Sequence, residues 1–263
     1  MKNKKGVIAN RKQSILLKIQ TDRDVSVDAL AEELQVSPVT IRRDLESFEK
    51  QGFVKRYYGG ARLIEGGLSE DPGKDAFIEH DDNINYRRAI AREAAALVED
   101  RDIIFINSSR TAVIVTEYIT ARHVDVITNN GNSIFGRHGQ GVNIILTGGA
   151  VNDIKRSMVG DFALNTIRKI NATKCIIGVS GITEDGDIST AVLQETMVNS
   201  LMIEKTSGIK ILLADHTKLG KMNNFIIAHI NQFTHLITDE LADDAFLKKL
   251  DNGQLVIIKA RLK

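Results

Sequence analysis

Apolar residues recur with the period of an α-helix along the first fifth of the chain. Between Arg11 and Gln20 they are Ile15, Leu16 and Ile19. A second stripe follows Ser26, a suitable N-cap, and consists of Val27, Leu30, Ala31 and Leu34. The pattern predicts two consecutive helices.

A third helix is predicted immediately afterwards. Ser37 can cap its N-terminus, and Pro38 fits its first position, where no backbone N–H is needed. We expect this helix to end near Gln51, before Gly52, and to turn three residues toward a core: Val39, Ile41 and Leu45. Because only two residues separate it from the second helix, the pair forms a tight helix-turn-helix.

The third helix carries polar and basic residues on its other side, with Thr40 in its first turn and then Arg42 and Arg43. A helix that directs its N-terminal turn and paired arginines at one partner suits the major groove of double-stranded DNA. In the alternative, the two arginines only pair with neighbouring acids, Asp44 or Glu46.

A short aromatic and basic strand follows, from Phe53 to Tyr58, with a turn at Gly59 and Gly60. A basic hairpin after a recognition helix is the wing of a winged helix, and its cations would lie over phosphates without reading bases. Alternatively, they are charges that protect a sheet edge. The candidate DNA-binding residues are Ser37, Thr40, Arg42, Arg43, Lys55, Arg56 and Tyr57.

The character of the chain changes after this hairpin. Residues 63–82 are rich in glycine and acids, contain Pro72 and show little apolar periodicity, which indicates a linker. Residues 1–65 hold 13 lysines and arginines against 9 acids, and the remainder holds 22 against 25, so the smaller part is the basic one. We therefore expect a DNA-binding domain at 1–62, a linker at 63–82 and a second domain at 83–263.

The second domain is predicted to be a doubly wound, mostly parallel α/β domain. It begins with an Ala-rich helix from about Asn83 to Leu97. Continuous apolar runs then alternate with helical or polar stretches, at Ile103–Ile106, Val124–Thr128, Val142–Thr147, Cys175–Val179, Ile209–Ala214, His235–Thr238 and Leu255–Lys259. Such runs are typical of a parallel sheet that helices cover on both faces.

Polar residues and glycines follow five of these runs, at the strand ends where parallel sheets bind ligands. An ordinary loop explains any one of these sets, but their recurrence predicts a pocket for a small phosphorylated sugar or polyol, with Arg110 and Lys218 as its cations. The candidate effector-binding residues are Asn107, Ser108, Ser109, Arg110, Thr111, Thr128, Asn129, Gly148, Gly149, Ser180, Gly181, Asp215 and Lys218.

Several longer motifs can be compared with known families. The N-terminal part reads LAEELQVSPVTIRRDLESFEKQG, with YGGA after the wing, and the second domain contains Leu146-Thr147-Gly148-Gly149, Gly178-Val179-Ser180-Gly181-Ile182 and Ala214-Asp215-His216-Thr217-Lys218. These motifs resemble the DeoR family of bacterial sugar-metabolism regulators. The resemblance implies a winged helix-turn-helix followed by a sensor similar to ribose-5-phosphate isomerase, and it adds Glu195 to the effector-binding candidates.

Two places depart from the family pattern. The phosphate loop, usually Asp-Ser-Gly-Thr-Thr, here reads Asn107-Ser108-Ser109-Arg110-Thr111. After Glu195, the usual Val-Lys-Arg is Val198-Asn199-Ser200, which removes two cations. The effector, or the way in which its phosphate is held, is therefore expected to differ from that of the commonest family members.

These observations predict a sequence-specific repressor of a carbohydrate-metabolism operon, gated by the effector and without enzyme activity. We expect a homo-oligomer, a dimer or higher, because symmetric operators need two copies. The alternative is a sugar-phosphate isomerase with an appended nucleic-acid-binding module, in which Glu195, Asp215 and Lys218 are acid–base groups. A third possibility is a C-terminal assembly domain without a ligand.

Composition argues against other classes. The only cysteine, Cys175, allows no internal disulfide, and no apolar run is long enough to span a membrane, so we expect a cytoplasmic protein without membrane contact. The sequence shows no nucleotide-binding phosphate loop, no cysteine pair and no clustered histidines. No metal or cofactor is expected.

Overall fold

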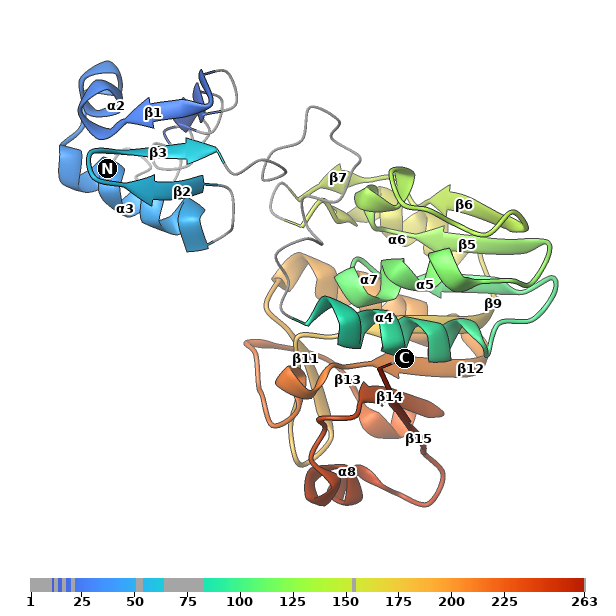
Figure 1. The fold of residues 1–263 in the computed structure, drawn as a ribbon. Helices are drawn as coiled ribbons and strands as arrows, with labels where there is room; N and C mark the ends of the chain where they lie inside the picture. Colours follow the sequence, from blue (N-terminus) through green and yellow to red (C-terminus); the bar gives the residue numbers. More distant parts are fainter. Residues whose placement is uncertain are drawn as a thin grey trace. The chain divides into compact units, whose positions relative to one another are not determined.

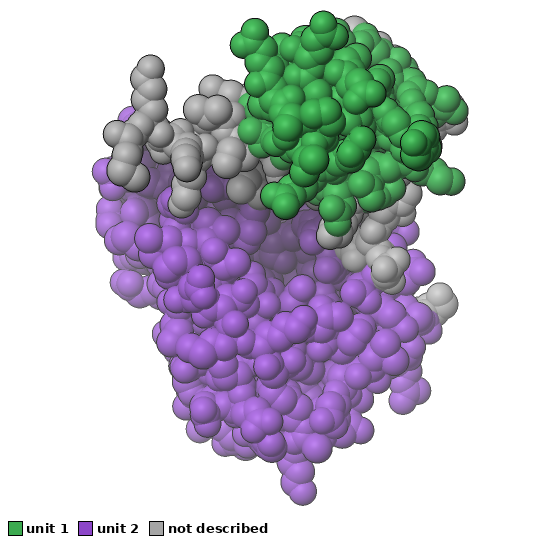
Figure 2. All heavy atoms as spheres, turned by 90° about the vertical axis from the view of Figure 1, so that its left-hand side faces the viewer, with its two compact units in different colours: residues 1–81 green, residues 82–263 purple. Residues whose placement is uncertain are grey.

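The computed structural model describes residues 11, 14, 15, 18, 19, 22–50, 54–63, 83–152 and 155–262. The chain divides into two compact units, residues 1–81 and 82–263, which Figure 2 colours separately. Apart from Leu63, the predicted linker lies outside the described residues. Within the described ranges, no helix is both long enough and apolar enough to cross a membrane.

The N-terminal unit contains the predicted helix-turn-helix (Figure 1). The described residues between 11 and 22 are helical, and α2 (Val27–Glu33) and α3 (Pro38–Lys50) follow. Ser26 caps α2 by accepting the backbone N–H of Ala29. The helices and the adjoining strands enclose a core of Ile15, Ile19, Val25, Val27, Leu30, Ala31, Ile41, Leu45, Phe48, Val54 and Ala61.

The predicted orientation of Val39 is wrong. Its side chain is 55% exposed, whereas Ile41 and Leu45 are fully buried. Residues two apart on a helix of about 3.6 residues per turn point to nearly opposite sides, so 39 and 41 cannot share a face. The buried stripe of α3 continues instead to Phe48.

The predicted hairpin after α3 is confirmed. It consists of β2 (Val54–Tyr57) and β3 (Gly60–Leu63), which are antiparallel. The turn between them is one residue earlier than predicted: it is formed by Tyr58 and Gly59, and Gly59 has a φ of +89°. Gly60 already belongs to β3.

A third strand, β1 (Asp24–Ser26), completes this sheet by pairing with the other edge of β3. β1 is not predicted from the sequence, because three residues are too few to show an alternating pattern. Gly60 allows the two backbones to approach, since a Cβ atom there would lie 2.4 Å from the carbonyl oxygen of Val25.

The C-terminal unit is built on one seven-stranded sheet in which every neighbouring pair is parallel. In spatial order its strands are β15 (Val256–Ala260), β14 (His235–Asp239), β12 (Thr206–Leu213), β9 (Ala172–Gly178), β4 (Ile103–Ile106), β5 (Val124–Thr128) and β6 (Val142–Leu146). All seven predicted apolar runs are strands of this sheet, so the prediction of the fold class is confirmed.

Helices cover both faces of the sheet and create two apolar cores (Figure 1). One core contains residues of α4 (Ile84–Ala95) and α5 (Arg110–Tyr118); the other contains residues of α6 (Asp161–Arg168), α7 (Leu193–Glu204) and α8 (Asp244–Leu250). Successive strand residues alternate between them: Ile104 and Ile106 join the first core and Phe105 the second. This alternation explains why the strands are apolar throughout.

Short strands form two smaller sheets that the sequence did not predict, because most of these strands have only two to four residues. One sheet comprises β10 (Gly181–Ile182), β11 (Asp187–Thr190) and β13 (Phe225–His229), and the other β7 (Ala150–Val151) and β8 (Met158–Val159). Residues 183–186 connect β10 to β11. Single 3-10 turns lie at η1 (Gly131–Ile134), η2 (His216–Lys218) and η3 (Ile230–Gln232).

The strand order reverses between β4 and β9. From this point β5 and β6 extend the sheet on one side, and β12, β14 and β15 extend it on the other. In open parallel sheets, ligands bind outside the carboxyl ends of the strands at such a reversal. Since β4 ends at Ile106 and β9 at Gly178, the residues directly after these two positions occupy the expected location.

Candidate DNA-binding surface and effector site

The start of α3 presents the predicted polar residues to solvent. The Ser37 hydroxyl accepts the backbone N–H of Thr40 at 3.3 Å and lies 2.9 Å from the Thr40 hydroxyl, so it caps the helix as predicted. Arg42 and Arg43 are both exposed, whereas Ile41 and Leu45 are fully buried. The two guanidinium groups therefore lie on the outer face of the second helix of the helix-turn-helix.

The alternative in which Asp44 neutralises these arginines does not fit the geometry. Asp44 is buried, and its carboxylate binds Arg11 of the first helix, with 2.7 Å between Nε and Oδ2. This ion pair joins two helices across the unit. Within the described part of the chain, neither Arg42 nor Arg43 forms an ion pair with it.

The three predicted wing residues differ in their contacts. The backbone N–H and Nε of Arg56 donate to the Glu49 carboxylate of α3 at 2.9 and 2.7 Å. The Tyr57 hydroxyl donates to Asp24 of β1. Lys55 is exposed and has no ion pair among the described residues. Arg56 therefore fastens the wing to the recognition helix, and Lys55 is the cation left facing solvent.

Asn107 links the two central strands at the reversal point. Its Nδ2 donates to the carbonyl oxygen of Gly178 at 2.8 Å, and its Oδ1 accepts the Gly178 N–H at 3.0 Å. The same Nδ2 lies 3.2 Å from Oδ1 of Asn199 on α7. A carboxylate at position 107 could not donate to either oxygen, so the amide found here is the group that this arrangement needs.

Ser109 follows as the N-cap of α5. Its hydroxyl accepts the backbone N–H groups of Thr111 and Ala112 at 3.2 and 3.4 Å. The space beside it is taken by Gly178, where a Cβ atom would lie 2.0 Å from the Ser109 hydroxyl oxygen. Serine at position 109 thus caps the helix with its side chain and depends on the glycine at the end of β9.

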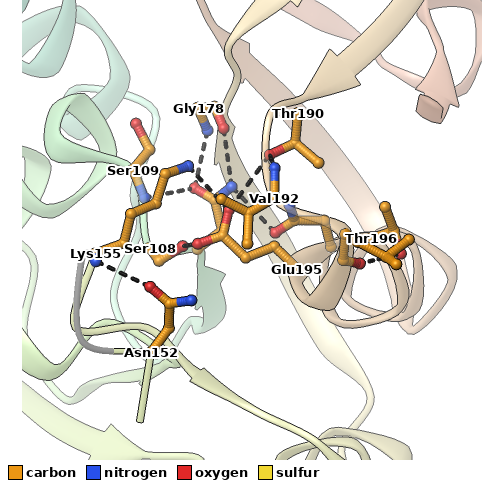
Figure 3. Close-up of polar contacts among 12 residues, drawn as sticks. Ser108, Ser109, Asn152, Lys155, Gly178, Thr190, Val192, Glu195 and Thr196 are labelled. Carbon is orange, nitrogen blue, oxygen red and sulfur yellow. Dashed lines mark hydrogen bonds and ion pairs between the residues drawn. The ribbon is translucent and has the colours of Figure 1, made fainter. Parts of the chain in front are cut away.

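Glu195 is the centre of a buried polar cluster in the first turn of α7 (Figure 3). Glu195 is only 2% exposed. Its carboxylate accepts hydrogen bonds from the Ser108 hydroxyl at 2.9 Å and from the Thr190 hydroxyl at 3.3 Å. Lys155, from the segment between β7 and β8, places its Nζ 3.0 Å from the second carboxylate oxygen. The structure thereby brings Glu195 and Ser108 together with Lys155, which was not among the predicted residues.

Asp215 is the centre of a second buried group, after β12. It lies 3.2 Å from Nε of Arg87 on α4 and accepts the backbone N–H and the hydroxyl of Thr217. Burial alone raises the pKa of Asp215, but the Thr217 hydroxyl, Lys218 and Arg87 together lower it below its ordinary value. The carboxylate is therefore stabilised in its charged form.

Lys218, in the same loop as Asp215, interacts electrostatically with three further cations. Burial lowers the pKa of the Lys218 ammonium; the Asp215 charge opposes this shift, and the charges of Arg87, Lys221 and Arg110 add to it. Arg110 and Lys218, the two predicted cations, are close enough for their charges to interact. An excess of positive charge beside strand ends and the start of α5 is suited to an anion.

Other predicted residues lie farther along the carboxyl edge, toward β8. Asn129 is fully buried, and its Nδ2 donates to the carbonyl of Met158 at 3.1 Å, while its Oδ1 has no hydrogen-bond partner among the described residues. Gly148 and Gly149 have φ values of +70° and +119°. A Cβ at Gly149 would lie 2.6 Å from the carbonyl oxygen of Val159, so this glycine serves a close approach of backbones.

The remaining candidates have structural partners in this state. Thr128 accepts the backbone N–H of Asn130 at 3.1 Å. The Ser180 N–H donates to the carbonyl of Ser189, and Gly181 belongs to β10. These three residues contribute to the backbone structure at the strand ends and carry no charge.

Three cations near the strand ends are not predicted from the sequence: Arg87, Lys155 and Lys221. Arg87 lies within a helix whose other charges are solvated, and Lys155 and Lys221 lie in irregular segments, so none follows a predicted strand. Among the described residues, no group of three His, Cys, Asp or Glu side chains could hold a metal ion.

Comparison with known families decides between the classes. A family model described as the DeoR-like helix-turn-helix domain matches residues 11–66, and one described as the DeoR C terminal sensor domain matches residues 82–240. The chain belongs to the DeoR family. It is a DNA-binding transcriptional regulator with a C-terminal sensor domain, and the resemblance seen in its motifs is confirmed.

Relatives of this regulator align over both units. The HTH-type transcriptional regulator GolR of Listeria innocua is 29% identical over 94% of this chain and 96% of its own. The HTH-type transcriptional repressor GlcR of Bacillus subtilis is 31% identical over 89% of each chain. A lactose phosphotransferase system repressor of Streptococcus mutans is 28% identical over 89% of this chain and 92% of its own.

Solved structures include a distant neighbour of the sensor. Ribose 5-phosphate isomerase A of Methanocaldococcus jannaschii aligns with 54% of this chain and 57% of its own, with 14% identity and a TM-score of 0.38. A similarity this weak carries no information about chemistry.

Proposed function

We propose that this DeoR-family regulator represses a carbohydrate-metabolism operon and that a small phosphorylated sugar or polyol controls its affinity for the operator. The effector binds at the carboxyl ends of β4, β9 and β12. The name of the Streptococcus relative, a lactose phosphotransferase system repressor, agrees with a carbohydrate signal.

The observation that supports the proposal is that the strand ends bring a group of cations and a group of hydrogen-bonding oxygens to the same edge of the sheet. Around Lys218 the charges of Arg87, Arg110 and Lys221 favour an anion such as phosphate. Around Glu195, carboxylate and hydroxyl oxygens offer hydrogen bonds to sugar hydroxyl groups. The loop after β4 joins the two sides, because Ser108 contacts Glu195 and Arg110 acts on Lys218.

At the other unit, we propose that the start of α3 enters the major groove. Ser37, Thr40, Arg42 and Arg43 would face the DNA, and Lys55 would contact a phosphate. Arg56 and Tyr57 contribute by holding the wing against α3 and β1 rather than by charge alone. Two copies of the chain bind one symmetric operator, since a single helix-turn-helix covers only one half-site.

We further propose that the sensor binds its ligand without transforming it. In an isomerase, a carboxylate that moves protons between sugar carbons must be available as a base. Here both oxygens of Glu195 already accept hydrogen bonds or an ion pair, from Ser108, Thr190 and Lys155. Incubation with ribose 5-phosphate should yield no ketose phosphate, and detectable turnover would favour the isomerase alternative.

Thermal-shift measurements test the effector directly. Purified protein is screened against pentose, hexose and polyol phosphates, each beside its unphosphorylated counterpart. We expect at least one phosphorylated compound to raise the midpoint of unfolding and its counterpart to have no effect, because a ligand that binds only the folded state stabilises it. Absence of any shift across the panel would favour an assembly domain without a ligand.

A further inference from the structure

Two neighbouring residues of α4 contact two neighbouring residues of the loop after β12. The Tyr86 and His216 rings meet edge to face, with 5.6 Å between their centroids and 81° between their planes. Next to them in the sequence, Arg87 and Asp215 form their ion pair at 3.2 Å. The loop of the proposed phosphate site is therefore joined to the beginning of α4 by two contacts.

The ion pair is deeply buried. Arg87 is 5% exposed and Asp215 1% exposed, although the rest of the buried face of α4 consists of alanine and isoleucine. A charge that loses its partner in such surroundings becomes costly, so the positions of the two side chains depend strongly on each other. A change in the charges around Asp215 therefore alters the preferred position of the Arg87 side chain.

An anion bound near the loop after β12 would change these charges. Asp215 faces two cations, Arg87 and Lys218, and both act on its charge. A dianion bound beside Lys218 competes with Asp215 for those cations. Because Arg87 is buried among alanine and isoleucine side chains of α4, its planar guanidinium can turn from Asp215 toward a second acceptor only if its side chain repacks against the first turns of this helix.

The start of α4 is the part of the C-terminal unit that is nearest in sequence to the DNA-binding unit. Its first residue is Ile84, and Arg87 lies in its first turn, so this turn is the first described structure of the C-terminal unit after the segment that leads from the DNA-binding unit. A displacement at Arg87 therefore acts on the end of the helix that is nearest in sequence to the helix-turn-helix.

We propose that Arg87 is the positioning residue that transmits effector occupancy to the start of α4 through its ion pair with Asp215. The inference rests on the proposed function, because it requires an anionic effector at Lys218. It assigns to Arg87 a role in coupling beyond its contribution to the positive charge around Lys218.

The test separates binding from coupling in the full-length protein. Wild type, Arg87→Gln and Arg87→Lys are compared with Arg88→Gln, a matched control that removes a positive charge from the adjacent, partly exposed position of the same helix. The probe is a mixture of glucose 6-phosphate, fructose 6-phosphate, ribose 5-phosphate and glycerol 3-phosphate. The DNA is a duplex selected from a random library by wild type.

Two quantities are measured for each variant: the thermal shift caused by the mixture, and the ratio of operator Kd values with and without it. We expect Arg87→Gln to retain a smaller thermal shift at a saturating concentration of the mixture, because Arg110, Lys218 and Lys221 remain. Its Kd ratio at the same saturation should fall toward one, from at least tenfold in wild type. Arg87→Lys, which keeps a positive charge at this position without the planar fork of arginine, should lose most of the ratio, and Arg88→Gln should keep all of it.

Other results contradict the proposal in distinguishable ways. If Arg87→Gln or, should that variant not fold, Arg87→Lys retains the wild-type ratio, Arg87 does not transmit the signal. If the thermal shift disappears together with the ratio, Arg87 belongs to the binding site and the coupling role is wrong. If wild type itself shows neither response, the proposed function fails and the inference fails with it.

Discussion

Asn107 and Asn199 touch each other at the centre of the sensor: Nδ2 of the first lies 3.2 Å from Oδ1 of the second, and each residue is 2% exposed. They are the positions at which this sequence has amides where the family pattern has an acid and a lysine. Because the two side chains are in contact, the two departures from the family pattern meet at one place in the structure. A neutral amide pair replaces a pair of opposite charges.

Restoring only one of the charges should therefore destabilise the protein. Asn107→Asp places a carboxylate against Oδ1 of Asn199 and the carbonyl of Gly178, and we expect a loss of about 3–5 kcal/mol in the free energy of unfolding. The double variant Asn107→Asp, Asn199→Lys should recover much of this loss. Urea unfolding measures both, with the exposed Asn224→Asp as control. Equal stabilities of the single and double variants would show that the two positions are not coupled.

At the DNA-binding unit, we expect the recognition helix and the wing to affect binding differently. Replacing Arg42 or Arg43 by alanine should cost about 1–3 kcal/mol of operator affinity and relax the preference at one base pair. Lys55→Ala should weaken binding to all sequences and reduce the dependence of log Kd on log salt concentration by about one. Binding isotherms at several salt concentrations distinguish the two effects. Unchanged operator affinity in the Arg42, Arg43 double variant would remove these residues from the interface.

Much of this architecture could be predicted from the sequence because its signals are local. The seven strands are continuous apolar runs, and the caps Ser26 and Ser37 directly precede their helices. The strands β1, β10 and β11 have only two to four residues. They form by pairing with other strands, so no local sequence pattern predicts them. Val39 was assigned to the core because it is apolar, although helical geometry sets it opposite Ile41.

The candidate site was predictable in part for a similar reason. Residues that follow a strand can be located from the strand, which is why Ser108, Asp215 and Lys218 were found. Arg87 and Lys155 reach the same edge from a helix and from an irregular segment, across 128 and 40 residues of sequence from their partners. Only the folded chain brings these charges together.

The opposite end of the sheet contains a buried ion pair that should govern acid stability. Lys174 Nζ lies 2.6 Å from Asp102, which also accepts the Thr173 hydroxyl and the Glu99 N–H. Burial raises the pKa of Asp102, but Lys174 and these hydrogen bonds lower it overall. Since the folded-state pKa is depressed, this carboxylate stabilises the fold above about pH 3.8, and the contribution is lost as the pH falls through the folded-state value.

We therefore expect Asp102→Asn to cost about 3–5 kcal/mol near pH 7, because it leaves the Lys174 charge without its buried partner. The difference from wild type should shrink as the pH is lowered below 3.8, where wild type loses the same interaction. Urea unfolding between pH 7 and strongly acidic pH checks this, with the exposed Asp161→Asn as control. A difference that stays constant with pH would contradict the assignment.

Cys175 provides a probe of the folded core. It is fully buried in β9, and burial raises the pKa of its thiol to about 11. Because the thiolate is the reactive form, we expect the native protein to react with a thiol reagent such as DTNB only after unfolding. The labelling rate should increase in parallel with urea unfolding monitored by circular dichroism. Rapid stoichiometric labelling of the native protein would show that this strand is accessible.

The central claim is that an anion at the strand ends of the sensor changes the affinity of the DNA-binding unit. Such coupling is reciprocal and typically amounts to about 1–3 kcal/mol. It requires cations at the strand ends, so Lys218→Ala should reduce it while leaving operator affinity without effector unchanged.

The most direct measurement is a fluorescence-anisotropy titration of operator DNA with the full-length protein, with and without the mixture of sugar and glycerol phosphates. We predict that the mixture changes the operator Kd of wild type by at least tenfold, that the unphosphorylated compounds do not change it, and that Lys218→Ala responds much less. An operator Kd that is the same with and without the phosphorylated mixture would contradict the account.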